Sequence, residues 1–246
     1  MIIKYSTIIY LKINLYNHLE DIAKYHYSLQ KQEKKMHPRV YQEFEKICSE
    51  KNINGSVLEI GAIPSSNSLL CMKSLEKATE KVGLDLKGPQ KFKDFKIHQG
   101  NANSMDIFQD EKFDVVLCNA VLEHDKYFWK TISEINRVTK PGGLIVLGTP
   151  GYKYFKIDNT KSLLTKAVMK VPSIRSLRLY KYLHPFLTVT VTHQVHDAPG
   201  DYYRFSPQTF KEVFFAEMDN VEVRSVLLPP IVIGVGHKRH SLKATE

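Results

Sequence analysis

The sequence predicts an α/β fold with a doubly wound, mostly parallel sheet, and three observations support this prediction. Between residues 57 and 148, apolar runs of strand length alternate with stretches whose apolar residues recur at helical spacing. The run from Phe113 to Asn119 is almost continuously apolar, as is typical of a strand buried on both faces. The short connection at Pro229-Pro230 joins two β-prone runs and favours an antiparallel hairpin at the end of the domain.

The elements of the first half follow from the spacing of their apolar residues. This spacing predicts a helix over Arg39–Lys51 and a second helix over about Ser66–Lys81. Short β-prone runs predict strands over Val57–Ile60, Lys81–Leu86 and Phe95–His98. The apolar residues with which the second helix would contact the core are Leu69, Leu70, Met72 and Leu75.

The second half continues the alternation. A helix is predicted over Lys126–Thr139, and the Pro-Gly-Gly run that follows is typical of a helix end. A strand over Leu144–Gly148 comes next. Ser206 is a candidate N-cap, with proline at the first helical position, for a helix that extends to about Phe215. The last two strands are predicted over Asn220–Leu227 and Ile231–Gly236.

The same pattern predicts one domain with a long insertion. We expect a domain over residues 36–246, with its core formed by residues 52–150 and 206–237. Residues 151–205 exceed the roughly 2–6 residues of an ordinary loop between a strand and a helix and are interpreted as a lid insertion. Residues 1–35 are interpreted as an N-terminal helical arm. A membrane span is not expected there, because their apolar runs are shorter than the roughly 20 residues that span a bilayer.

The net charge of the chain is concentrated in one segment. The chain of 246 residues carries 35 basic and 26 acidic residues, a formal net charge of +9. Between Lys153 and Lys181 there are eight basic residues against one acidic residue, interleaved with apolar side chains. Such a segment suits either an anionic membrane surface or an anionic ligand, and the alternative is a solvated lid helix.

The cysteines and histidines favour a cytoplasmic protein without a metal site. The three cysteines are widely spaced and form no CxxC pair, which argues against a disulfide framework. The ten histidines form no HExxH motif, so we expect no metal.

The turn after the first predicted strand is a candidate ligand site. Gly61 stands at the carboxyl end of that strand, where glycine lets the backbone approach a ligand closely. The GxGxxG fingerprint is absent, because Ile63 and Ser66 occupy its later glycine positions. A pyrophosphate site is therefore disfavoured, and a tight turn without a ligand remains the alternative.

Polar residues after the next two strands suit a nucleoside. Asp85, at the end of the second strand, is placed to accept hydrogen bonds from both hydroxyls of a ribose. Asn101 and Asn103 follow the third strand, and an amide both donates to and accepts from the edge of an adenine. A solvated aspartate and a polar turn are the alternatives for these two segments.

Taken together, these segments resemble the class I S-adenosylmethionine-dependent methyltransferases, in particular their small-molecule, type 11-like branch. The resemblance rests on the first strand with its glycine, on Phe113-Asp114 with the strand that they begin, on Leu122-Glu123-His124, and on Arg137–Gly143, which reads RVTKPGG. It covers residues 57–150 closely and 201–237 more loosely. It implies a Rossmann-like methyltransferase sheet of seven strands, mostly parallel with the last strand antiparallel, and a helical lid insertion.

The resemblance also implies how S-adenosyl-L-methionine would be bound. The methionine part would be lined by residues at the end of the first strand, the ribose and adenine by residues after the next two strands, and the sulfonium by residues after the fourth. In that order these residues are Glu59, Gly61, Ala62, Asp85, Leu86, Asn101, Ala102, Asn119 and Val121. The chain departs from the family at Ile63-Pro64-Ser65, where further glycines are usual, and at Asn101, where aspartate is common. These departures leave a non-catalytic, cofactor-binding relative as an alternative.

The acceptor side has two candidate groups. His124 directly follows the fourth strand and is the candidate general base, because histidine titrates near neutral pH. A histidine that only packs is the alternative. The candidate acceptor-binding residues are His193, His196, Asp201, Tyr202, Tyr203 and Arg204. Their stretch, PGDYYRF, resembles one in methyltransferases encoded with polysaccharide genes, which implies a sugar-containing acceptor, whereas a turn held by an Asp201–Arg204 pair is the alternative.

The sequence therefore predicts a methyltransferase that acts on a small or glycan-like acceptor, on oxygen. One alternative is a peripheral membrane enzyme with a lipid-linked substrate, in contact with the membrane through residues 153–184. A nucleic-acid substrate is disfavoured, because Asn119 is followed by Ala-Val-Leu and not by the Pro-Pro-Tyr/Phe run expected of a base N-methyltransferase.

Overall fold

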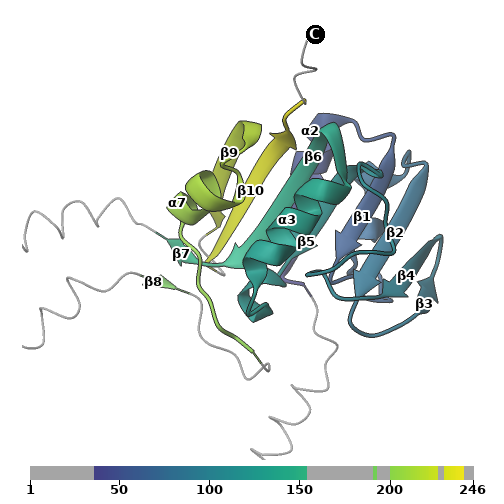
Figure 1. Cartoon of the computed structure of the whole chain (residues 1–246), viewed down its shortest axis with the longest axis horizontal. Helices are drawn as coiled ribbons and strands as arrows, with labels where there is room; N and C mark the ends of the chain where they lie inside the picture. Colours follow the sequence, from purple (N-terminus) through teal and green to yellow (C-terminus); the bar gives the residue numbers. More distant parts are fainter. Residues whose placement is uncertain (1–35, 154–190, 193–199, 227–229, 241–246) are drawn as a thin grey trace, which may run out of the picture. The chain divides into compact units, whose positions relative to one another are not determined.

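The computed structural model describes residues 36–153, 191–192, 200–226 and 230–240 (Figure 1). Backbone contacts divide the chain into Met1–Met36 and His37–Glu246, and the helices and strands reported below all belong to the second unit. The expected N-terminal arm and most of the expected lid insertion lie outside the described residues.

An eight-stranded sheet forms the centre of this unit, in the order β3-β4-β2-β1-β5-β6-β10-β9. Neighbouring pairs among β4, β2, β1, β5 and β6 are parallel, whereas β3 is antiparallel to β4, and β10 is antiparallel to both of its neighbours. The strands are β1 (Ser56–Ile60), β2 (Glu80–Asp85), β3 (Gln90–Phe92), β4 (Phe95–Gln99), β5 (Phe113–Asn119), β6 (Thr139–Pro150), β9 (Met218–Val226) and β10 (Ile231–Lys238). The predicted doubly wound sheet and its antiparallel last strand are confirmed, but the expected number of seven is wrong, because the short edge strand β3 adds an eighth.

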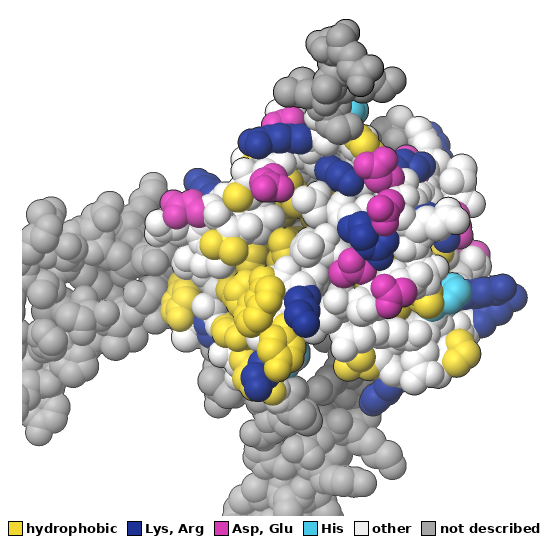
Figure 2. Space-filling model, viewed as in Figure 1, with side chains coloured by type: hydrophobic (Ala, Val, Ile, Leu, Met, Phe, Trp, Pro, Cys, Tyr) yellow, Lys and Arg dark blue, Asp and Glu magenta, His cyan; other side chains and the backbone are white. Residues whose placement is uncertain are grey.

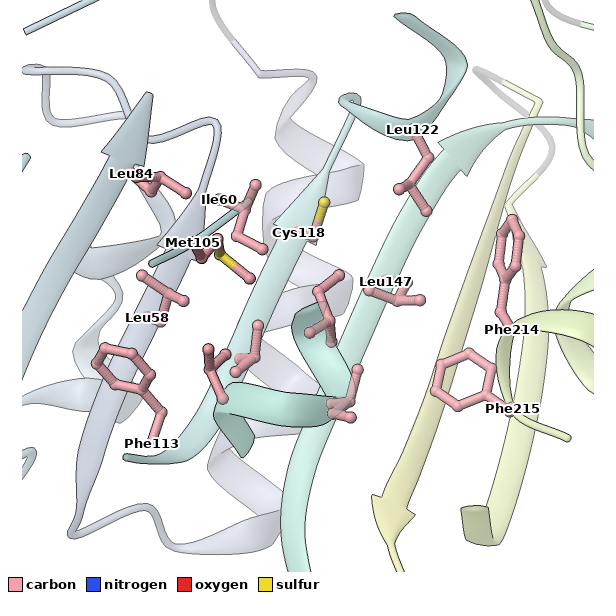
Figure 3. Packing of buried hydrophobic residues seen from close by; sticks show 14 of the residues in the cluster. Leu58, Ile60, Leu84, Met105, Phe113, Cys118, Leu122, Leu147, Phe214 and Phe215 are labelled. Carbon is pink, nitrogen blue, oxygen red and sulfur yellow. The ribbon is translucent and has the colours of Figure 1, made fainter. Parts of the chain in front are cut away.

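Helices pack on both faces of this sheet. Helix α2 (Pro38–Lys51) lies behind the strands, and α3 (Phe128–Val138) lies in front of β5 and β6 (Figures 1 and 3). Both agree with the predicted helices to within two residues. Helix α7 (Pro207–Thr209) is a single turn that continues into the π-helical turn η4 (Phe210–Phe214). The predicted cap of this helix is confirmed, because the Ser206 Oγ accepts a hydrogen bond from the Thr209 backbone N–H at 3.1 Å.

One buried apolar cluster joins the sheet to α3 and to the turns after α7 (Figure 3). Ile135 and Val138 of α3 are fully buried against it, and Phe128 and Ile132 are partly buried beside them. Phe210 and Phe215 pack on β10 at Gly234, where a Cβ atom would lie 2.5 Å from each ring. The glycine therefore makes room for the two rings.

The predicted helix over Ser66–Lys81 is wrong. Two 3₁₀ turns, η1 (Leu69–Cys71) and η2 (Lys73–Leu75), take its place, and β2 already begins at Glu80. The cause is the carboxylate of Glu59, which accepts hydrogen bonds from the backbone N–H groups of Leu69 (3.0 Å) and Leu70 (3.3 Å) and so holds this segment in tight turns. The predicted core contacts are confirmed, since all four apolar side chains are buried.

The insertion leaves the sheet and returns to it at one place. Gly151 forms a parallel bridge with Phe205, and the Phe205 N–H donates to the Pro150 carbonyl at 3.3 Å. A two-stranded sheet of β7 (Tyr152–Lys153) and β8 (Val191–Thr192) follows the start of the insertion. The described ends of the insertion therefore lie against the core.

Candidate active site

A cavity of about 400 Å³ opens at the carboxyl ends of β1, β2, β4 and β5. This is the place at which an open parallel sheet binds ligands, because the chain continues from β1 to one side and later returns to β5 on the other. Its lining residues come from four turns and from the segment before α7. They are Ile60, Gly61, Leu84, Asp85, Leu86, Gly100, Asn101, Ala102, Asn103, Ala120, Val121, His124, Asp125, Lys126, Tyr127 and Tyr202.

Gly61 forms part of the floor between β1 and β5. Its φ of +79° lies in the left-handed region, and a Cβ atom there would lie 2.5 Å from a methyl carbon of Val121. Its N–H donates to the Leu84 carbonyl at 2.8 Å, and the N–H of Ala62 donates to the same oxygen at 3.3 Å. The turn is therefore fastened to β2 by its own backbone, and glycine is required for the close approach to Val121.

Asp85 and Asn101 stand at the ends of neighbouring strands, with Leu86 beside them. One carboxylate oxygen of Asp85 accepts a hydrogen bond from the Lys87 N–H at 2.8 Å, and the side-chain oxygen of Asn101 accepts one from the Asn103 N–H at 2.9 Å. These bonds orient both side chains in the cavity wall. Leu86 exposes 70% of its surface, which leaves an apolar face for a flat ring.

The structure places six of the nine expected cofactor residues in the cavity wall, and Glu59, Ala62 and Asn119 elsewhere. Glu59 is buried and accepts hydrogen bonds from the Ser68 hydroxyl and from two backbone N–H groups. Burial raises the pKa of Glu59 to about 7, although these bonds act in the opposite direction. Ala62 is also buried, and the buried side-chain oxygen of Asn119 lies toward Gly148 of β6. Glu59 therefore supports the turns after β1, whereas Ala62 and Asn119 lie outside the cavity wall.

The other half of the cavity is built by the turn after β5. His124 ends the 3₁₀ turn η3 (Leu122–His124) and exposes 26% of its side chain. The following residue, Asp125, is fixed by the Asn103 amide (2.6 Å) and the Thr131 hydroxyl (2.7 Å), which both donate to one of its oxygens. Asn103 thus ties the turn after β4 to the turn after β5, so the two halves of the cavity share a rigid wall.

Aromatic side chains form the rim on this side. Tyr127 and Tyr202 line the cavity and expose 44% and 55% of their surfaces, and Trp129, 52% exposed, lies edge-on to Tyr127 at 5.6 Å between ring centroids. The ammonium groups of Lys126 and Lys130 lie 5.6 and 5.4 Å from the Tyr127 ring centroid. Figure 2 shows hydrophobic side chains gathered on this face, with basic side chains among them.

Among the expected acceptor-binding residues that the structure describes, Tyr202 alone lines the cavity. Asp201 and Arg204 form a buried pair in which both carboxylate oxygens accept from the guanidinium. The Tyr203 hydroxyl donates to the Lys126 carbonyl at 3.1 Å. Asp201, Tyr203 and Arg204 therefore hold the segment in position, as the alternative of a turn held by an ion pair anticipates. His193 and His196 lie outside the described residues.

Glu123 is a residue of the site that the sequence analysis did not assign. Its side chain is fully buried beside His124, and 3.8 Å separate the Glu123 Oε1 from the His124 Nε2. Its backbone carbonyl accepts hydrogen bonds from Tyr202 (2.8 Å) and Tyr203 (3.3 Å), so it also joins the two acceptor-side segments. The signal in the sequence was an acidic residue between a buried strand and a candidate base.

The described residues contain no group of three or more histidine, cysteine or acidic side chains placed to hold a metal ion. Nor does any helix within them have the length and apolar character needed to cross a membrane.

Comparison with known proteins identifies the domain. Residues 63–147 match a family model described as a methyltransferase domain. No sequence among the curated proteins matches the chain.

Solved structures share the fold at low sequence identity. A chain from the complex between the Trm112 methyltransferase activator and a putative methyltransferase of Haloferax volcanii has a TM-score of 0.52 at 16% identity, covering 82% of this chain and 92% of that chain. Phosphoethanolamine N-methyltransferase 2 of Haemonchus contortus, in complex with S-adenosyl-L-methionine, has a TM-score of 0.54 at 13% identity, covering 82% of this chain and 53% of that chain. The N-methyltransferase NodS of Bradyrhizobium japonicum WM9 has a TM-score of 0.51 at 11% identity, covering 82% and 96%.

Proposed function

Because residues 63–147 place this chain in the type 11 branch of the class I S-adenosylmethionine-dependent methyltransferases, we propose that it methylates an oxygen atom of a small, glycan-like acceptor. The cofactor is S-adenosyl-L-methionine. The observation that supports the proposal best is the single cavity wall that joins Asp85 and Asn101 on one side to His124 and the aromatic rim on the other.

The residues of the cavity fit this cofactor. The Asp85 carboxylate suits the two ribose hydroxyls, the exposed face of Leu86 suits the adenine ring, and the Asn101 amide suits its edge. Gly61 leaves the space that a Cβ atom would fill beside Val121. The volume of about 400 Å³ lies within the usual range of roughly 300–1,000 Å³ for small-molecule sites.

His124 is proposed as the general base. The bound cofactor supplies a methyl group on a positively charged sulfur, and the chain positions the acceptor for in-line attack on it. An acceptor hydroxyl must lose its proton as it attacks, and an imidazole at the cavity wall suits this task near neutral pH.

The aromatic rim supports the glycan-like acceptor. The rings of Tyr127, Trp129 and Tyr202 combine apolar faces with polar groups, which suits a sugar ring that presents both C–H bonds and hydroxyls. The same proposal places the reaction in the cytoplasm, and the three free cysteines support this.

The variant His124→Ala tests the assignment of the base. We expect wild-type affinity for S-adenosylhomocysteine, measured by calorimetry, and a loss of turnover of about 10²-fold or more on a panel of free and nucleotide-linked hexoses. His98→Ala is the control, since His98 is exposed on β4 and outside the cavity wall. Unchanged turnover in His124→Ala would remove the base from the proposal.

A second candidate function is the same reaction on a lipid-linked acceptor at an anionic membrane. Trp and Tyr side chains beside lysines are typical of protein segments at membrane interfaces, and Tyr127, Trp129, Lys126 and Lys130 form such a group at the cavity mouth.

Flotation with phosphatidylglycerol-containing vesicles separates the two candidates. If the second is correct, the protein floats with the vesicles, and Trp129→Ala combined with Lys130→Glu reduces the bound fraction several-fold. The exposed pair Lys91→Glu and Lys96→Glu, on β3 and β4, is the control for charge alone. Equal loss in both double variants, or no flotation of the wild type, rules this candidate out.

A further inference from the structure

Among the residues that the structure describes, two glutamates are buried, and they differ in how their carboxylates are satisfied. Glu59 and Glu123 are 3% and 0% exposed, and burial raises the pKa of each to about 7. Glu59 has three hydrogen-bond donors, from Ser68 and from two backbone N–H groups. Neither carboxylate oxygen of Glu123 has a hydrogen-bond partner from another residue within the described part of the chain, and among backbone donors only its own N–H lies close enough to favour the ionised form. Hydrogen bonds offset the cost of burying the Glu59 carboxylate. They do not do so for Glu123, so its burial, which costs free energy, needs a different explanation.

Glu123 lies beside His124, a titratable side chain of the cavity wall. The Glu123 Oε1 lies 3.8 Å from the His124 Nε2, and His124 lines the cavity whereas Glu123 does not. The other charged groups that face Glu123 are Arg204, which favours its ionised form, and Asp201, which opposes it and is paired with Arg204. The thiol of Cys118 on β5 is the titratable neighbour from the sheet, and burial keeps it protonated.

We propose that Glu123 is a positioning residue that stabilises the charged imidazolium of His124 once the histidine has taken the acceptor's proton. The inference rests on the proposed function. In that step the acceptor O–H bond breaks and its proton moves to His124, while the methyl–oxygen bond forms and the methyl–sulfur bond breaks. The enzyme is then left with an imidazolium beside a buried side chain whose pKa of about 7 leaves it ionised in the upper part of the neutral range. There the attraction between the two charges is strengthened, because water is excluded from the Glu123 side. Glu123 itself does not contact the acceptor, since it is absent from the cavity wall.

The protonation of His124 tests this inference without an acceptor. The titration midpoint of the imidazole is measured by NMR on histidine-labelled protein, with His124→Asn used to identify its signal. In Glu123→Gln we expect the midpoint to fall by about one pH unit, a tenfold weaker hold on the proton, because the neighbouring charge is lost. The matched control is Glu59→Gln, which removes a carboxylate that is equally buried but engaged elsewhere, and leaves the His124 midpoint unchanged.

The rate profile gives a second measurement that a merely structural role would not move. In Glu123→Gln the acidic limb of kcat/KM moves to lower pH with the midpoint, and the plateau falls several-fold, since a weaker base accepts the proton less readily. Glu123→Asp keeps the charge, provides a second variant if the amide impairs folding, and shows an intermediate midpoint. A folded Glu123→Gln protein with the wild-type midpoint overturns the inference. If Glu123→Gln lowers the midpoint but no acceptor is methylated, the interaction between Glu123 and His124 stands and the proposed function is rejected instead.

Discussion

At the scale of single residues, we expect cofactor binding to depend most on Asp85. Its carboxylate lies in the cavity wall at the end of β2, and a hydrogen bond to a charged group contributes about 1.5–3 kcal/mol. We expect Asp85→Asn to weaken S-adenosylhomocysteine binding by about tenfold or more, measured by calorimetry. Glu76→Gln, on the exposed surface, serves as the control. Equal affinities in all three proteins would show that the ribose is not bound here.

Some residues at the carboxyl ends of strands were placed at the cavity correctly from the sequence. Gly61 and Asp85 belong to this group, because the end of a parallel strand locates a residue at the cavity before its contacts are known. Glu59 and Asn119 also stand at or next to a strand end, but they lie outside the cavity wall. Neighbouring side chains of a strand point to opposite faces of the sheet, and the sequence does not reveal which face of β1 or β5 borders the cavity.

At the scale of elements, Glu59 determines the form of the segment between β1 and β2. Its pKa rises from 4.5 to about 7 in the folded protein, so the native state holds the proton more tightly than the unfolded chain does. The stabilisation that this group contributes is therefore complete below pH 4.5 and is lost as the pH rises through 7. The folded protein as a whole is thus more stable in mildly acidic solution, as far as this group is concerned.

The variant Glu59→Gln makes this pH dependence measurable. Relative to the wild type, its free energy of unfolding is expected to rise by up to about 3 kcal/mol between about pH 5 and pH 8, because it lacks the group that becomes unfavourable. Urea unfolding at a series of pH values gives the difference. Glu134→Gln provides the contrast, since hydrogen bonds from Arg137 lower the pKa of Glu134, and its difference from wild type stays constant over the same range. A constant difference for Glu59→Gln as well would contradict the expectation.

The type of an element was predictable where only one kind of secondary structure fitted its apolar pattern. The run that forms β5 was predicted to the residue, because a continuous apolar run between polar ends fits a buried strand. The apolar residues before β2 fitted both an α-helix and 3₁₀ turns. The 3₁₀ turns form because the backbone of this segment donates hydrogen bonds to the carboxylate of Glu59, ten residues before Leu69. Strand β3 was missed, because its three residues carry no alternation and lie at the sheet edge.

At the scale of the whole molecule, the cavity draws on four strands, so a ligand bound there stabilises the sheet as a unit. S-adenosylhomocysteine at about 100 times its Kd adds roughly 2.7 kcal/mol to the free energy of unfolding. For a domain of this size we expect Tm to rise by about 5–10 °C. Thermal melts with increasing S-adenosylhomocysteine test this, and Asp85→Asn should need a higher concentration for the same rise. No rise at any concentration would contradict cofactor binding.

The order of strands was predictable only in part. Parallel alternation and the final hairpin follow from patterns within the chain, and both are confirmed. The meeting of Glu123 with the segment before α7 joins residues almost eighty positions apart, and it depends on backbone bonds to Tyr202 and Tyr203. Contacts of this kind do not produce a periodic pattern of residues, so a single sequence does not reveal them.

The bridge between Gly151 and Phe205 has an evolutionary consequence. Since the chain departs from the core and rejoins it at adjacent residues, the stretch between them can lengthen, shorten or be exchanged while the strands that carry Gly61 and Asp85 keep their register. Related chains can then differ in the length and sequence of this stretch while they keep the cavity wall that those strands build.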